Sequence, residues 1–250
     1  MNIPNPGRQP EKIAPDPILQ ALVELRFEPA GPPDAIFGMV YGRVKDLLGE
    51  AKRLPFLDIP EALRNADPGL LFQPHYSFQR EALTFQVGPR VMVFAVHPYP
   101  GGTVFLRKVR EILDALSPTE LCKTPVRLGL RYINFFPGNV LPRTTLGLTL
   151  DGGSLIGHPT VLQTEFVEGK SRCRLHAVFP ADALVGGKRE RGTIIDIDGF
   201  RTPDGIVPFS SEGIMAALEE LRILDKRLFF SLLQEEFLAS LHPVFQEDGT

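Results

Sequence analysis

The sequence lacks the residues and segments that several classes of protein need. It has no tryptophan and only two cysteines, Cys122 and Cys173, which lie far apart and form no CxxC motif. This excludes a disulfide framework and a cysteine-based zinc site, and it favours a reducing compartment. No apolar run approaches the roughly 20 residues that a membrane-spanning helix needs. The start, MNIPNPGRQPEK, has no apolar segment typical of a secretory signal. We therefore expect a cytoplasmic protein that does not bind membranes.

An excess of charge of one sign is also absent. The 27 basic and 30 acidic side chains give a formal net charge of −3, so no overall positive potential attracts nucleic acid or anionic lipid. The five histidines are scattered without HExxH spacing, and there is no GxGxxG or P-loop motif. These absences argue against common hydrolases, kinases and dehydrogenases. We expect no cofactor and no metal, and a binding protein in preference to an enzyme.

The composition that is present is that of a globular protein. The chain has 250 residues, of which 43% are hydrophobic and 23% charged, enough for one large domain with a substantial core. Residues 1–17 contain five prolines, which remove backbone donors and disfavour helix, so we predict an extended N-terminal arm. Residues 18–250 are predicted to form a single domain, with two packed subdomains, 18–122 and 123–250, as the alternative.

The hydrophobic patterns predict an α+β fold with a mixed or antiparallel sheet and flanking helices. In the first half the predicted order is β-α-β-β-β-α-β, close to a ferredoxin-like plan with one extra strand. Its predicted helices are 34–49 and 103–116, and its predicted strands are 18–29, 69–80, 82–87, 90–96 and 126–136. The second half is strand-rich and ends in helices. It has predicted strands at 146–150, 159–168, 171–179 and 192–200, a mobile charged loop at 185–193, and helices at 211–224 and 225–241.

Two aspartates in GTIIDIDGF are the first candidate site. Asp196 and Asp198 alternate with isoleucines, so both carboxylates project from one face of a strand, about 7 Å apart. Clustered carboxylates suit Mg²⁺, but no further ligand follows at a recognisable spacing. The favoured interpretation is an outward-facing pair that meets an arginine on a neighbouring strand, Arg131 or Arg26. A catalytic or metal-dependent role for Asp196 and Asp198 together with Arg131 is the alternative.

Arg131 and Asn134 belong to RYIN, in a strand expected to be central. An arginine there needs a partner, because an unpaired buried charge is very costly. We favour an ion pair with an aspartate of 196–198. The alternative is an arginine that binds a carboxylate or phosphate ligand through two of its guanidinium nitrogens.

A basic stripe is the second candidate site. KSRCRLH places several basic side chains on one face of a strand, and the charged segment that follows adds more. The predicted partner-binding residues are Lys170, Arg172, Arg174, Lys188, Arg189 and Arg191. Such a stripe can bind phosphates, although a solvated strand face is the more common explanation. Glu165 on the neighbouring strand would neutralise part of it.

Several phrases resemble a sporadically distributed family of bacterial proteins, about 250 residues long, to which no molecular function is assigned. They are PILQALVELRF, QVGPRV, YPGG, RLGLRYIN and IDIDGF, spread over most of the chain. The chain departs from the family pattern at Gln20, where a glutamate is usual, and at Gly102, where an aromatic is common. The resemblance implies a shared α+β fold, and the Gln20 departure argues against an essential carboxylate there.

Together these features predict a non-enzymatic cytoplasmic binding module or adaptor. We expect it to recognise a protein partner, with nucleic acid as the open alternative. The sporadic distribution of the family suggests an accessory or defence-related system. The sequence leaves the oligomeric state undefined.

Overall fold

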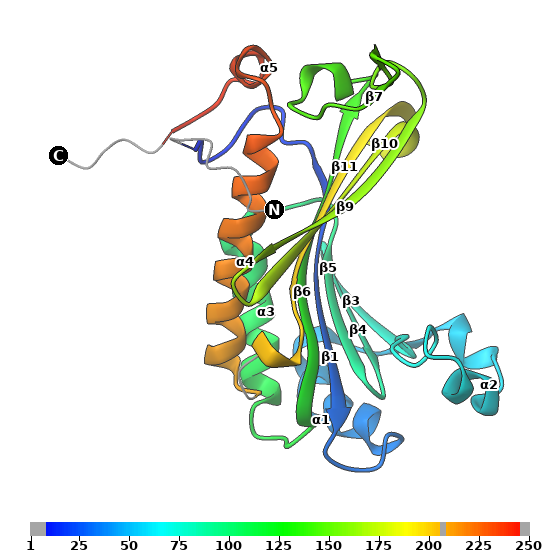
Figure 1. The fold of residues 1–250 in the computed structure, drawn as a ribbon. Coiled ribbons are helices and arrows are strands. Elements are labelled where there is room, and N and C mark those ends of the chain that lie inside the picture. Colours follow the sequence, from blue (N-terminus) through cyan, green and yellow to red (C-terminus); the bar gives the residue numbers. More distant parts are fainter. Residues whose placement is uncertain (1–8, 206–208, 246–250) are drawn as a thin grey trace. The chain divides into compact units, whose positions relative to one another are not determined.

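A computed structural model describes residues 9–205 and 209–245 and shows an α+β fold (Figure 1). The α-helices are α1 (Ala35–Leu48), α2 (Glu61–Ala66), α3 (Gly102–Leu116), α4 (Ser211–Ser231) and α5 (Glu235–Ser240). The first six strands are β1 (Ile18–Pro29), β2 (Lys52–Arg53), β3 (Tyr76–Arg80), β4 (Leu83–Gly88), β5 (Val91–Val96) and β6 (Cys122–Pro137). The others are β7 (Thr149–Leu150), β8 (Gly153–Ser154), β9 (Thr160–Glu168), β10 (Ser171–Val185) and β11 (Lys188–Arg201). Three short 3₁₀ helices lie at Pro55–Asp58, Leu141–Arg143 and Pro203–Gly205.

Nine strands form a large, mainly antiparallel sheet, which confirms the predicted α+β class. The chain divides into two compact units. Unit 1 comprises residues 1–19, 131–199 and 222–250, and unit 2 comprises residues 20–130 and 200–221. The divisions fall within β1, β6, β11 and α4, so each of these elements contributes residues to both units.

In unit 2 the strand order is β2-β3-β4-β5-β1-β6. Gly88 ends β4 and Val91 begins β5, with Gly88 and Val91 paired across the tight turn that the Gly-Pro sequence predicted. The apolar residues of α3 recur at helical spacing, and six of them are buried: Phe105, Leu106, Val109, Ile112, Leu113 and Leu116. This helix therefore forms, as predicted, because it buries one continuous apolar stripe.

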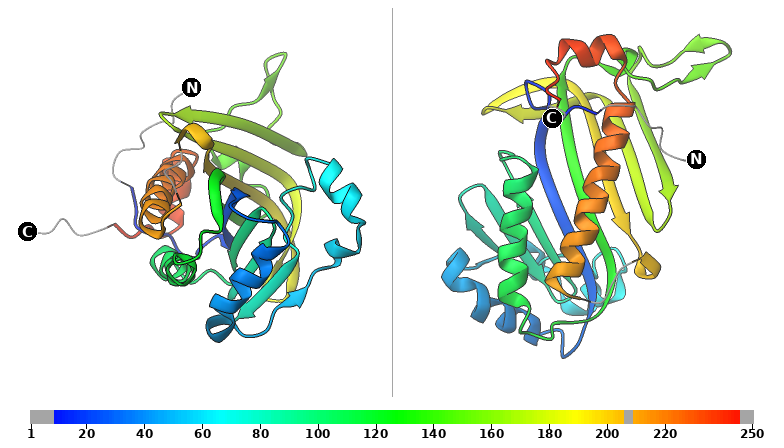
Figure 2. Two further views of the ribbon diagram at one scale, coloured as in Figure 1. Left: turned by 90° about the horizontal axis from the view of Figure 1, so that it is seen from below. Right: turned by 90° about the vertical axis from the view of Figure 1, so that its left-hand side faces the viewer.

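In unit 1 the strand order is β6-β11-β10-β9 (Figure 2). One face of these strands packs against the C-terminal part of α4 and against α5, with Cys173, Leu175, Ile195 and Ile197 in the shared core. α4, α5 and the residues that directly follow them contribute Leu224, Leu228, Phe229, Phe230, Leu232, Leu233, Phe237 and Leu241 to this core. The alternate residues of β10 and β11 must therefore point to the opposite face of the sheet.

The prediction of a mobile loop at 185–193 is wrong. β10 extends to Val185, β11 begins at Lys188, and only Gly186 and Gly187 form the turn. Both glycines have positive φ, 56° and 81°, the backbone conformation that a two-residue hairpin turn of this kind requires. The charged residues after the turn are thus part of a strand.

The other departures concern element boundaries. The strand predicted at 69–80 is only the five residues of β3, and the two C-terminal helices divide at 231 rather than at 224. Of the predicted N-terminal arm, residues 1–8 lie outside the described part. The remainder is fixed to the C-terminal segment, since Glu11 and Ala14 donate backbone hydrogen bonds to Val244 and Leu241. Ile13 is buried in the core of unit 1.

Candidate functional site

Several candidate residues of unit 1 lie on the sheet face opposite to α4. Because Cys173 and Leu175 of β10 and Ile195 and Ile197 of β11 face the core, their sequence neighbours face the other way. These neighbours include Arg172 and Arg174 of β10 and Asp196 and Asp198 of β11. The strand pattern thus places most of the predicted site residues on one face.

Arg131 of β6 and Asp196 of β11 form an ion pair, as predicted. Arg131 Nε donates to Asp196 Oδ1 at 2.7 Å, and Arg131 Nη2 donates to Asp196 Oδ2. Both carboxylate oxygens are therefore bound by a single guanidinium group, the two-bond geometry that arginine favours. The Asp196 side chain is only 8% exposed, whereas that of Arg131 is 45% exposed. Asp196 thus faces away from the core and meets an arginine, as predicted, but it is buried rather than exposed because Arg131 covers it.

Asn134 lies on the core side of β6 and is buried. Its Nδ2 donates to the backbone oxygen of Ile195 at 2.9 Å. Asn134 therefore serves the pairing of β6 and β11. Asp198, on the same face as Asp196, is half-buried.

Glu165 of β9 joins the two arginines of the basic stripe. It lies directly opposite Arg174 in the β9–β10 register, and it accepts hydrogen bonds from Arg172 Nη1 at 2.9 Å and Arg174 Nη2 at 3.2 Å. The hydrogen bond from Arg172 is the main reason why the pKa of Glu165 lies below its usual value. The predicted neutralisation by Glu165 is confirmed. Two arginines share one carboxylate here, so the cluster keeps a positive excess.

The predicted stripe is not continuous. Lys170 lies in the Gly169–Lys170 turn beside Arg172, at the start of β10, whereas Lys188 and Arg189 follow the turn at the other end of that strand. At about 3.3 Å per residue, the two groups are on the order of 40 Å apart along the strand. Arg189 instead pairs with Asp182 at 2.9 Å. We call Lys170, Arg172 and Arg174 the hairpin stripe and treat it separately from the group at Lys188, Arg189 and Arg191.

A buried carboxyl group was missed by sequence reasoning. Asp225 of α4 is 1% exposed, among the core residues of unit 1. Its Oδ1 accepts hydrogen bonds from Cys173 Sγ, at 3.3 Å, and from the Gly199 backbone, while its Oδ2 has no hydrogen-bond partner among the described residues.

Burial raises the pKa of Asp225 well above its ordinary value, and the charges of Asp198 and Asp196 raise it further. Burial also raises the pKa of the Cys173 thiol, which therefore remains a donor. The signal in the sequence is the spacing, since Asp225 lies four residues after Leu221 and three before Leu228, on the apolar stripe of α4.

The described residues contain no group of three or more His, Cys, Asp or Glu side chains that could hold a metal ion. A surface pocket in unit 2 is lined by Leu47, Leu48, Arg80, Glu81, Leu83, Lys108, Glu111 and Ile112. Its Glu81 is already bound by Lys108 at 2.8 Å. This pocket offers an ion pair and aliphatic walls rather than an arrangement for acid–base catalysis.

Comparison with protein-family models finds no match to the chain, and comparison with curated proteins finds no significant match. The resemblance to the sporadic bacterial family therefore stays a prediction. Within the two described ranges, no helix combines the length and the apolar character needed to cross a membrane.

Proposed function

We propose that this chain is a non-enzymatic binding module or adaptor, and that its partner docks on the unit 1 sheet face that carries the hairpin stripe. The observation that carries the proposal is the cluster of Arg172, Arg174 and Glu165 on that face. Both arginine side chains are well exposed, at 48% and 43%, so they can contact a partner while still bound to Glu165. Charged groups arranged in this way select a partner of complementary charge and orient it.

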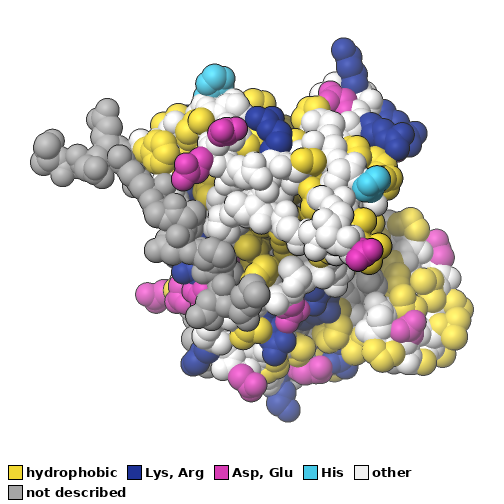
Figure 3. All heavy atoms as spheres, turned by 45° about the horizontal axis from the view of Figure 1, so that its top comes forward, with side chains coloured by type: hydrophobic (Ala, Val, Ile, Leu, Met, Phe, Trp, Pro, Cys, Tyr) yellow, Lys and Arg dark blue, Asp and Glu magenta, His cyan; other side chains and the backbone are white. Residues whose placement is uncertain are grey.

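An acidic protein surface fits the cluster better than nucleic acid does. Glu165 repels any anion, so it disfavours a continuous phosphate backbone that runs across the cluster more than a single protein carboxylate that approaches Arg172 from the side away from Glu165. Figure 3 shows basic side chains on the face it presents as separate groups among acidic and apolar ones, without one extended basic field. Nucleic-acid binding usually depends on such a field.

The experiment is a quantitative pull-down of the tagged chain from its host, with three proteins compared by mass spectrometry. Wild type is compared with Arg172→Glu/Arg174→Glu, and Arg189→Glu is the control, because Arg189 is an exposed strand arginine outside the stripe. A partner retained by wild type and by the control, but lost from the double variant, supports the proposal. Equal recovery from all three proteins would refute docking at the stripe.

The nucleic-acid alternative has its own measurement. If the three cations of the hairpin stripe contacted duplex phosphates, the slope of log K against log salt would be about −2.7, at roughly −0.9 per contact. Anisotropy titrations of DNA and RNA at two salt concentrations test this. We expect no binding at physiological salt, and a slope of that size that is lost in Arg172→Glu/Arg174→Glu would establish nucleic acid as the partner.

We propose further that unit 2 is a variant of the ferredoxin-like plan. The order β1-α1-β3-β4-β5-α3-β6, apart from the short β2 and α2, supports this. A cytoplasmic site of action and an accessory or defence-related system are part of the same proposal, and they rest on the composition and the family resemblance. The enzyme alternative, with Asp196, Asp198 and Arg131 as its residues, has less support because Arg131 already occupies both oxygens of Asp196.

A further inference from the structure

Strand β9 is an unprotected edge of the sheet. Among the described residues it pairs only with β10 and ends the strand order. Natural sheets protect their edges with short strands, proline or lysine, because a free row of N–H and C=O groups pairs with other chains. The other edge strand, β2, follows this rule with only two residues, Lys52 and Arg53. β9 has nine residues and contains no proline, lysine or arginine.

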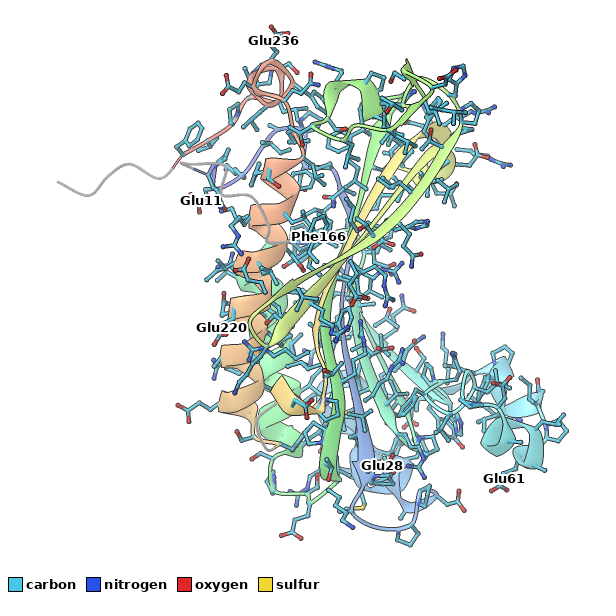
Figure 4. All side chains as sticks on the ribbon, in the orientation of Figure 1. Glu11, Glu28, Glu61, Phe166, Glu220 and Glu236 are labelled. Atoms are coloured by element: carbon cyan, nitrogen blue, oxygen red, sulfur yellow. The ribbon has the colours of Figure 1, made fainter. Side chains whose placement is uncertain are left out.

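The side chains of β9 also suit a second strand. On the face that carries the hairpin stripe, Val161 is 71% exposed and Val167 is 48% exposed. On the opposite face Leu162 and Phe166 are partly buried, and Phe166 lies on the side of α4 (Figure 4). Each face of the edge therefore presents two apolar side chains, one near each end of the strand.

The hairpin register determines which backbone groups are available. Glu168 and Ser171 flank the two-residue turn and form the first pair of the β9–β10 ladder. In a hairpin of this kind that pair is hydrogen-bonded, and hydrogen-bonded and non-hydrogen-bonded pairs then alternate along an antiparallel ladder. The even-numbered residues of β9 therefore direct their N–H and C=O groups toward β10. The odd-numbered residues, from Val161 to Val167, direct theirs outward.

We propose that β9 pairs with β9 of a second copy of this chain, antiparallel, about a two-fold axis at Thr164. In this register every outward-directed backbone group of one strand meets an outward-directed group of the other. The opposed residues are Val161 with Val167, Leu162 with Phe166, Gln163 with Glu165, Thr164 with Thr164, and Thr160 with Glu168. Apolar residues thus face apolar ones, an amide faces the carboxylate, and no like charges are opposed. Such cross-strand pairs are the main source of sheet stabilisation.

The neighbouring registers of the β9–β9 pair give less favourable cross-strand contacts. A shift of the axis to Glu165 places the Glu165 carboxylates of the two copies directly opposite each other, which is unfavourable. A shift to Gln163 places Val161 opposite Glu165 and Val167 opposite Pro159, outside the strand. A two-fold pairing is closed, since β9 of each copy is then paired on both sides and offers no free edge to a third copy.

The pairing is independent of the proposed function. It uses the backbone and valines of β9, whereas partner docking uses the arginines of β10. Reversal of charge at Arg172 and Arg174 should abolish docking and leave the dimer, so failure of one proposal can be told from failure of the other. In the dimer the hairpin stripes of both copies lie on one continuous sheet.

The test is sedimentation velocity over a range of concentrations. Wild type should dimerise, and Val161→Lys/Val167→Lys should weaken the dimer by about tenfold or more, because lysines then oppose each other at both ends. Val161→Lys/Val167→Glu is the matched variant, since in the proposed register each lysine faces a glutamate of the second copy. It should dimerise far more strongly than the double-lysine variant. Leu184→Lys, at an exposed position of β10, should leave the dimer unchanged.

Disulfide formation tests the register itself. Thr164→Cys should form a disulfide with the same position of the second copy. A non-hydrogen-bonded pair on the axis has Cα atoms about 4.5 Å apart, which is within disulfide reach. Gln163→Cys should not, because its counterpart lies two residues away along the strand. A monomeric wild type at all concentrations, or a dimer that is insensitive to the double-lysine variant, would overturn the proposal. Cross-linking of Gln163→Cys in place of Thr164→Cys would overturn the register.

Discussion

Asp225→Asn should stabilise the protein at neutral pH, although it removes a carboxylate and adds no contact. Asp225 is buried, its Oδ1 accepts from Cys173 and Gly199, and its Oδ2 has no hydrogen-bond partner among the described residues. A carboxylate in such a place would be a buried charge without a cation bound to it, so the neutral acid is favoured. Asparagine reproduces the size of the neutral acid and keeps the accepting oxygen.

The size of the effect follows from proton linkage. The pKa of Asp225 is raised in the folded state, so the folded protein binds more protons than the unfolded chain at pH values between the two pKa values. The stability that Asp225 contributes is complete below its unfolded pKa, near 4, and is lost as the pH rises toward the folded pKa. The loss is up to about 1.4 kcal/mol per pH unit within that window. The asparagine of the variant does not titrate, so the variant lacks this loss.

Urea unfolding at several pH values from about 4 to 8 measures the difference in unfolding free energy between variant and wild type. The difference should shift in favour of the variant as the pH rises, by up to about 1.4 kcal/mol per unit, and should level off where the carboxyl ionises. Glu212→Gln, at an exposed position in the first turn of α4, is the control and should show no such rise. A difference that is constant with pH, or that shifts in favour of wild type, would refute a neutral Asp225.

Three further predictions concern residues of β6 and β11. Gly199→Ala should lower the free energy of unfolding by about 1–3 kcal/mol, because the added Cβ would collide with Asp225 Oδ1. In a double-mutant cycle measured by thermal unfolding, Asp225→Ser should restore part of that stability. Arg131→Met should lower the free energy of unfolding by about 1–3 kcal/mol, because it leaves the Asp196 carboxylate unpaired. The double variant Arg131→Met/Asp196→Leu should lose clearly less stability, and an equal loss in both variants would contradict the ion pair. Calorimetric titration with Mg²⁺, Mn²⁺ and Ca²⁺ should show no binding tighter than millimolar, and a micromolar site lost in Asp198→Asn would restore the enzyme alternative.

The sequence predicts most strands because period-two alternation survives wherever one face of the sheet is buried. The strand predicted at 159–168 differs by one residue from β9, and the strand at 90–96 differs by one residue from β5. The prediction of a loop at 185–193 fails because clustered charges occur on exposed strands as well as in loops. The glycine pair at 186–187 between two alternating segments is itself a hairpin signal, and it outweighs the charges that follow it.

Of the candidate site, the Arg131–Asp196 pair could be predicted although 65 positions separate the two residues. A charge in a central strand requires an opposite charge nearby, so the sequence must contain its complement on another strand. The split of the basic stripe could not be predicted, because it depends on the length of β10, and the sequence pattern understated that length by six residues, ending at 179 instead of Val185.

Asp225 shows the limit of that reasoning about buried charge. A buried carboxyl can be neutralised by an arginine, which leaves a second residue in the sequence to be found, or by a proton, which leaves none. Asp196 follows the first route and we expect Asp225 to follow the second, so only Asp196 has a counterpart that spacing and strand order can reveal. A carboxyl neutralised by a proton leaves only a steric signal in the sequence. Here Gly199 leaves room for the Asp225 carboxyl, and Asp225 occupies a position of the apolar stripe of α4 where leucine is expected. An acidic residue at a core-facing helix position, with a glycine in the strand beneath it, therefore indicates a neutral buried acid rather than a site that holds a cation.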